Sequence, residues 1–142
     1  MIREYLGNFD YIDLSRILYT VFESNIDQDT LENYYLGENK HILVAVDDAN
    51  KLQGFALVEF RYDHVRSRKF GYITYLAIDE KYRNHGIGKE LLIAVEKLCK
   101  DHKCSAIELT SANFRTTAHL FYGKMGFTKK ATTVFIKELS QI

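Results

Sequence analysis

The residues with the clearest chemical potential form one stretch, in which a basic, glycine-containing turn follows an apolar run. Arg83 and Lys89 flank Gly86 and Gly88, and the run Phe70 to Ile78 precedes them. Glycines let a ligand approach the backbone closely, and the first turn of a helix offers unpaired N–H groups and a favourable dipole. The pattern predicts a phosphate-binding turn between a strand and a helix. The alternative is structural, with glycines that only permit close packing of the helix on the strand.

Two nucleotide-binding motifs do not fit this turn. The Walker loop requires a glycine where Arg83 stands, and a Ser or Thr where Glu90 stands. The dinucleotide fingerprint requires a third glycine where Leu91 stands. The turn therefore indicates a phosphate ligand of another kind.

A second block of residues lies downstream and gives the turn its context. It comprises Ile107-Glu108-Leu109-Thr110-Ser111, Arg115, Ala118-His119, Phe121-Tyr122 and Gly126-Phe127. This block and the Arg83-x-x-Gly86-x-Gly88 pattern together resemble the two signatures of the GNAT superfamily of acetyl-CoA-dependent N-acetyltransferases, in their usual order and spacing. The resemblance covers nearly the whole chain.

The resemblance implies an α/β (α+β) fold of the GNAT type and a way to bind acetyl-CoA. A central mixed, mostly antiparallel sheet of about six to seven strands is flanked by about four helices. The sheet splays between the fourth and fifth strands, after Ile78 and beside Ser105 to Thr110, and the pantetheine arm enters there. The resemblance further implies acetyl-CoA as the donor substrate.

The resemblance also implies the roles of individual residues. The backbone of Leu76, Ala77 and Ile78 bonds the pantetheine and polarises the thioester carbonyl. The pyrophosphate is held by the N–H groups of Arg83, Asn84, His85, Gly86, Ile87, Gly88 and Lys89. Tyr122 contacts the donor and protonates the departing thiolate, although packing at the rim is an alternative role for it. Asn113 and Arg115 are candidate contacts of the CoA phosphates, and Arg115 could equally contact an acidic substrate or be an exposed helix residue.

Two positions depart from the common family pattern. Arg115 stands where many relatives carry Asn, and Thr74 stands where relatives with a glutamate base carry it. Glu59 and Glu108 are then candidate bases, and Asp79 is a further carboxylate near the turn. A water chain or an already neutral amine could also serve. The identity of the base stays open.

The elements that must position these residues follow from the spacing of apolar side chains. Periods of three to four residues predict helices, and β-branched or aromatic runs predict strands. The expected helices cover about 11–24, 28–36, 87–100 and 115–124, and the expected strands cover about 1–6, 41–46, 52–60, 70–78, 105–110 and 132–139. The helix between the strands at 70–78 and 105–110 predicts a parallel crossover and a mixed sheet.

Composition limits the class of protein. The chain has 142 residues, 46% of them apolar, and 19 basic residues balance 19 acidic ones. This predicts one domain over 1–142, with no drive toward nucleic acid and no apolar run near the roughly 20 residues that span a bilayer. Two cysteines and a start without a signal core predict a cytoplasmic protein, and five histidines without short paired spacing predict no metal site.

The acceptor is the open part of the functional prediction. Acidic residues without any Lys or Arg lie between Arg16 and Lys40, which favours an amine or polyamine, whereas the basic loop 61–69 favours an acidic acceptor. The leading hypothesis is direct acetyl transfer to a small primary amine in a ternary complex. The alternatives are a protein N-acetyltransferase and, because Thr74 replaces the base, a non-catalytic acyl-CoA sensor. A homodimer in which the last strand pairs across two copies is possible.

Overall fold

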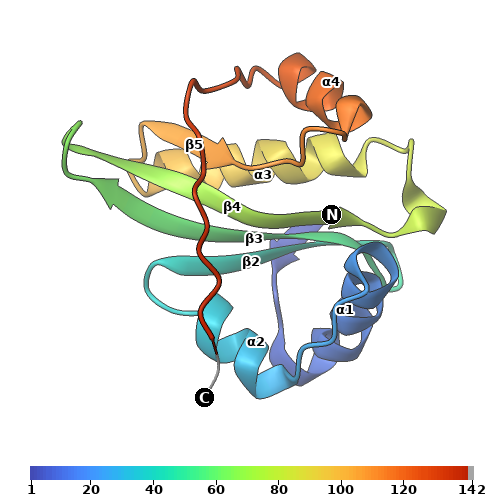
Figure 1. Cartoon of the computed structure of the whole chain (residues 1–142). Helices are drawn as coiled ribbons and strands as arrows, with labels where there is room; N and C mark the ends of the chain where they lie inside the picture. Colours follow the sequence, from blue (N-terminus) through green and yellow to red (C-terminus); the bar gives the residue numbers. More distant parts are fainter. Residues whose placement is uncertain (141–142) are drawn as a thin grey trace. The chain divides into compact units, whose positions relative to one another are not determined.

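The structure is a computed structural model that describes residues 1–140, and the chain divides into two compact units. The larger unit, Met1–Thr110, contains a five-stranded sheet, and the smaller unit begins at Ser111 (Figure 1). The strands are β1 (Ile2–Glu4), β2 (Lys40–Val46), β3 (Leu52–Asp63), β4 (Arg68–Ile78) and β5 (Ala106–Leu109). The helices are α1 (Gly7–Phe22), α2 (Gln28–Tyr35), α3 (Ile87–Asp101) and, in the smaller unit, α4 (Thr116–Lys124), with a 3-10 turn η1 (Glu80–Tyr82).

The sheet is mixed, as the sequence predicts. Its order is β1-β2-β3-β4-β5, with antiparallel pairing from β1 to β4 and parallel pairing between β4 and β5. The tight β2–β3 connection forms because the Asp47 side chain accepts hydrogen bonds from the N–H groups of Ala49 and Lys51. The parallel step is made by α3, because parallel strands require a crossover connection.

Helices cover both faces of the sheet in the larger unit. Figure 1 shows α1 and α2 together on one side of the strands and α3 on the other. The core between α1, α2 and the sheet includes Leu14, Ile17 and Leu31, each fully buried. Burial of each such side chain contributes about 1.5–3 kcal/mol. The residues that α3 buries lie at helical spacing: Ile87, Leu91, Leu92, Val95 and Cys99.

Helix α1 begins a turn earlier than the spacing of its apolar residues predicts. The spacing predicts a start at about residue 11, whereas the helix begins at Gly7 and Asp10 lies inside it, fully buried. Its carboxylate accepts a hydrogen bond from the Leu6 N–H at 2.7 Å and two from the Arg3 guanidinium at 2.7 and 3.0 Å. Asp10 lies in the first turn, and its carboxylate satisfies the N–H of Leu6, the N-cap residue, which would otherwise lack a partner at the helix end. This contact fixes the start of the helix at Gly7.

The predicted final strand over 132–139 is wrong. These residues have no strand pairing, and their side chains are exposed, with Phe135 90% and Ile136 82% accessible. The described residues 1–140 therefore contain five strands rather than the expected six to seven, together with four α-helices. Residues that favour strands do not form one by composition alone, because strand propensity largely reflects packing against neighbouring strands.

Candidate functional site

The end of β4 separates from β5 and leaves an open strand edge. Pairing between the two strands runs from Phe70↔Ala106 to Ile73↔Leu109 and continues no further among residues 1–140. On its other side β4 remains paired with β3 as far as Ile78. Leu76, Ala77 and Ile78 thus lie on a strand that is held on one side and free on the other. This confirms the predicted splay between the fourth and fifth strands.

A β-bulge lies where the splay begins, and no pattern in the sequence predicts it. Leu57 pairs with Tyr75 and Val58 pairs with Ile73, so Thr74 is the extra residue on β4. Bulges disturb the ladder and redirect neighbouring side chains, and they are frequent next to active sites. Thr74 is also the position at which the resemblance places the glutamate base of those relatives that have one. The bulge therefore belongs to the candidate site, whereas the residue on it is not a carboxylate.

The turn after β4 has a backbone conformation that suits an anionic ligand. Asn84 and Gly86 adopt left-handed conformations, with φ of +65° and +80°. A Cβ on Gly86 would meet no atom within 4 Å, so the positive φ, and not a lack of space, favours glycine there. Gly86 is the N-cap of α3, and no side chain in the described part of the chain caps this helix. Its first N–H groups, with exposed Arg83 and Lys89 nearby in sequence, suit an anionic ligand.

Glu59 and Glu108, the two candidate bases, belong to one row of the sheet. Glu59 on β3 is directly opposite Tyr72 on β4, and Tyr72 is opposite Glu108 on β5. Residues in directly opposed positions share a face of the sheet, so Tyr72 lies between the two carboxylates. Residues 59, 72 and 108 are called the acidic row below. The Tyr72 hydroxyl is 3.3 Å from the Thr110 hydroxyl.

Arg61 contacts two members of the acidic row. Its guanidinium carbon lies 3.9 Å from the centroid of the Tyr72 ring, and its Nη2 is 3.3 Å from Glu59 Oε2. A cation held between an aromatic face and a carboxylate is a favourable arrangement, and both side chains of this pair are partly exposed. The row therefore already accommodates a positively charged group.

An aromatic cluster lies on the same face of the sheet and was not predicted. The Tyr75 ring centroid is 5.1 Å from that of Phe22 on α1 and 6.5 Å from that of Tyr35 on α2. Burial raises the pKa of Tyr35, with further contributions from Tyr75 and Glu59. The cluster thus brings α1 and α2 close to the acidic row. No local sequence pattern reveals it, because its members come from three separate elements.

In the smaller unit, Tyr122 is fixed by the way in which α4 ends. The Phe127 N–H donates to the Tyr122 carbonyl and the Gly126 N–H donates to the Gly123 carbonyl, while Gly126 has a φ of +93°. These are the bonds of a Schellman motif, which brings the side chain after the glycine back onto the helix. The ring centroids of Tyr122 and Phe127 are 5.8 Å apart. The Gly126-Phe127 pair therefore orients the Tyr122 ring.

The electrostatic surroundings of Tyr122 keep its phenol protonated. Burial raises the pKa of Tyr122 above its ordinary value of 10.0, and the positive charge of Arg115 offsets part of this effect. Arg115 is the N-cap residue of α4, and Arg115 and Asn113 are both exposed. His119 Nε2 lies 2.9 Å from the Ala112 carbonyl oxygen, a structural contact. Tyr122 and Arg115 therefore interact, and Asn113 and Arg115 remain predicted donor contacts.

The two cysteines pack together at the C-terminus of α3. The Cys104 N–H donates to the Cys99 carbonyl at 2.8 Å, and Lys103 has a φ of +62°, which again marks a Schellman motif. Burial raises the pKa of Cys99 to about 12, so its thiol is unreactive at neutral pH. Cys99 is therefore a buried apolar thiol, and burial also raises the pKa of the partly exposed Cys104.

Two further classes of site receive no structural support. Residues 1–140 contain no group of three or more His, Cys, Asp or Glu side chains arranged to hold a metal ion. Within the same residues, every helix is too short or too polar to cross a membrane. The candidate chemical groups are those of the β4 edge, the turn after it, the acidic row and Tyr122.

Comparisons with known proteins identify the family of the chain. The profile of the acetyltransferase (GNAT) family matches residues 9–127. N-alpha-acetyltransferase 30 of Saccharomyces cerevisiae is 39% identical over 67 residues, which are 46% of this chain and 38% of that protein. The match thus spans less than half of the length of the yeast relative.

Solved structures share the fold over almost the whole chain. A tetramutant of the BH1408 protein from Bacillus halodurans is 26% identical, with a TM-score of 0.86 and coverage of 97% of this chain and 99% of that one. An aminoglycoside acetyltransferase from an uncultured soil metagenomic sample has a TM-score of 0.84 at 22% identity, over 99% of this chain and 96% of its own. Because the family profile covers well over half of the sequence, the chain belongs to the GNAT acetyltransferase family.

Proposed function

We propose that this protein transfers an acetyl group from acetyl-CoA to a primary amine by direct attack in a ternary complex. The observation that carries this proposal is the open edge of β4, which begins at the Thr74 bulge and leads into the left-handed turn before α3. An open edge offers backbone groups to an extended chain such as pantetheine, and an uncapped helix start offers N–H donors to its pyrophosphate. Family membership supports acetyl-CoA as the donor.

In the proposed complex, the larger unit binds and polarises the donor. The backbone of Leu76–Ile78 would hold the pantetheine and stabilise negative charge on the thioester oxygen, and residues 83–89 would hold the pyrophosphate. Asn113 and Arg115 would add contacts to the CoA phosphates. The neutral amine forms the new C–N bond, the C–S bond breaks, and the amine loses a proton.

The proton steps are assigned to the acidic row and to Tyr122. Glu59 or Glu108 would accept the proton of the amine, directly or through water. Tyr122 would donate its phenolic proton to the CoA thiolate, a role that suits a tyrosine whose pKa is raised by burial. Glu59 and Tyr72 already contact the Arg61 guanidinium. The acidic row would contact a small amine in the same way.

A peptide N-terminus is the second candidate acceptor, because the partial relative from yeast is an N-alpha-acetyltransferase by name. Release of CoA should therefore be measured with aminoglycosides, polyamines, amino acids, aminophosphonates and short peptides. Turnover with one class of acceptor would assign the substrate. Donor binding without any turnover would favour the acyl-CoA sensor instead. A cytoplasmic location and a homodimer remain predictions.

The role of Tyr122 is tested by Tyr122→Phe, which removes only the hydroxyl. General acid catalysis contributes about 10²- to 10⁴-fold, so we expect kcat to fall at least about 100-fold while the acetyl-CoA Kd changes less than about twofold. Tyr19→Phe is the matched control, because Tyr19 is 55% exposed on α1. Unchanged turnover in Tyr122→Phe would remove the proton-donor role.

A further inference from the structure

Asp79 is a buried carboxylate at the end of β4, where the chain leads through η1 into the turn at residues 83–89, called the donor turn below. The residue is only 4% exposed and follows the last residue of β4. Its backbone N–H donates to the Gln53 carbonyl at 2.9 Å, and its carbonyl accepts from the Tyr82 N–H at 2.9 Å. Its side chain accepts from the Lys81 N–H at 3.3 Å, as the N-cap of η1. Asp79 therefore sets the direction in which the chain leaves the sheet.

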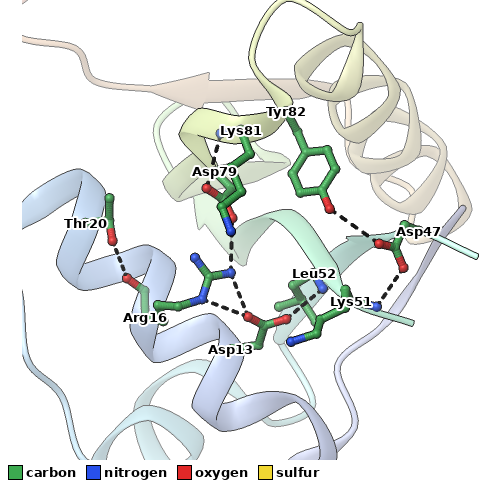
Figure 2. Close-up of polar contacts among 9 residues, drawn as sticks. All are labelled: Asp13, Arg16, Thr20, Asp47, Lys51, Leu52, Asp79, Lys81 and Tyr82. Carbon is green, nitrogen blue, oxygen red and sulfur yellow. Dashed lines mark hydrogen bonds and ion pairs between the residues drawn. The ribbon is translucent and has the colours of Figure 1, made fainter. Parts of the chain in front are cut away.

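The charge of Asp79 is balanced from a distant helix. Arg16 on α1 places Nη2 3.0 Å from Asp79 Oδ2 and 2.7 Å from Asp13 Oδ1 (Figure 2). The other oxygen of Asp13 accepts from the Leu52 N–H at 2.8 Å, at the start of β3. A single guanidinium thus joins α1, the first residue of β3 and the end of β4.

The far end of η1 is held by the β2–β3 connection. The Tyr82 hydroxyl donates to Asp47 Oδ2 at 3.4 Å, and Asp47 also accepts from the Lys51 N–H (Figure 2). Both ends of η1 are therefore tied to segments that lie far away in sequence. Arg83, the first residue of the predicted phosphate turn, follows η1 directly.

We propose that Arg16 is a positioning residue for the donor-binding turn, acting through Asp79, in the acetyl transfer proposed above. This inference rests on that proposed function. A buried carboxylate without its cation must gain a proton or reach water, and either change costs free energy. Movement of Asp79 carries η1 with it, because the Lys81 and Tyr82 N–H groups bond to the same residue. The N–H groups of residues 83–89 then lose their alignment with the pyrophosphate.

The chain contains a matched pair that separates positioning from general stability. Arg3 binds buried Asp10 with two hydrogen bonds near the start of the same helix, and the Arg3 side chain is only 18% exposed. Arg16 is 44% exposed and its contact with Asp79 is single. Arg3→Ala should therefore lower the melting temperature at least as much as Arg16→Ala, without a link to the donor turn.

The test measures the acetyl-CoA Kd by calorimetry and the steady-state constants of wild type, Arg16→Ala, Arg16→Lys and Arg3→Ala. We expect Arg16→Ala to raise the Kd and KM for acetyl-CoA about tenfold, with kcat and the acceptor KM changed less than about threefold, because misplaced binding groups lose affinity steeply. Arg16→Lys restores part of the affinity, since it keeps the charge. Amide hydrogen exchange over 79–89 increases in Arg16→Ala only.

The possible outcomes are distinct. Equal acetyl-CoA Kd values for Arg16→Ala and Arg3→Ala would overturn the positioning role, whatever their stability. An acetyl-CoA Kd that Arg16→Lys leaves at the Arg16→Ala value would also count against it. If Arg16→Ala does not fold, Arg16→Gln, which keeps a donor without the charge, must show the same selective loss. Failure of the wild type to bind acetyl-CoA would refute the proposed function itself.

Discussion

Gly71 permits α3 to pack closely on β4, and one added methyl group tests this contact. A Cβ at position 71 would overlap the Cys99 sulfur, which is on α3. The other nearest atoms are Cys99 Cβ and Val58 Cγ1, both at an ordinary contact distance of 3.8 Å. The steric conflict in Gly71→Ala therefore involves a single atom, and removal of that atom should relieve it.

The expected energies follow from this geometry. Gly71→Ala should destabilise the protein by about 1–3 kcal/mol, as overpacked core variants do, because Cys99 is 2% exposed and its thiol has little room to move. Cys99→Ala removes one buried heavy atom, at a cost near the roughly 0.8 kcal/mol of a buried methylene. In the double variant the new methyl takes the place of the sulfur. We expect it to be within about 1 kcal/mol of wild type, with a coupling energy of about 1–3 kcal/mol.

Urea unfolding of the four proteins measures these differences, with equal m-values as the check that the same surface is exposed. Acetyl-CoA binding should follow stability, because α3 carries the donor turn at its start. Purely additive costs in the double variant would refute the reasoning, since they would mean that Cys99 is not the obstacle.

Two other predictions concern β4 and the Arg16 network. Gly54→Ala places a Cβ 2.6 Å from the Ala77 carbonyl oxygen, so the backbone must move. We expect the free energy of unfolding in urea to fall by at least the roughly 1–3 kcal/mol of other overpacked variants, and acetyl-CoA binding to weaken. Gly123→Ala, where no atom lies within 4 Å, is the control that should be neutral or stabilising, and equal effects would contradict the steric account. Burial would raise the pKa of Asp13, but hydrogen bonds from Arg16 and the Leu52 N–H hold it below its ordinary 3.8. The stability that Asp13 contributes is therefore full above pH 3.8 and is lost as pH falls through the lowered pKa. The difference in unfolding free energy between wild type and Asp13→Asn should therefore shrink only below about pH 4. A difference that stays constant down to about pH 2 would contradict this.

Local patterns predicted most elements because their causes are local. The helical spacing of Leu91, Leu92 and Val95 and the aromatic, β-branched run of β4 identify elements whose apolar side chains are buried. The start of α1 was misplaced because it depends on Arg3, which lies outside the helix. The strand predicted at 132–139 does not form, and here the local pattern is present while residues 1–140 supply no partner strand. Its composition favours a strand, but pairing depends on a partner that composition does not specify.

The candidate site divides in the same way. The turn itself could be predicted from Gly86 and Gly88, because glycine punctuates a chain locally, but the left-handed conformations of Asn84 and Gly86 are known only from the structure. Gly126-Phe127 similarly marks the end of α4. The bulge at Thr74 and the contact between Arg16 and Asp79 left no trace in the sequence, because each depends on a second segment that is distant along the chain.

These long-range features hold the strand edge that the proposed function assigns to acetyl-CoA. A strand that lacks a partner on one side gains order from its other side and from its ends. β4 is paired with β3 from Arg68 to Ile78 except at the Thr74 bulge, and its last residue leads into Asp79, which is fixed by Gln53, Arg16 and η1. The contacts that hold the free edge are therefore all made within the chain and need no ligand. Less conformational entropy is then lost on binding, and the backbone N–H groups are already aligned for the charge that develops on the thioester oxygen in the proposed reaction.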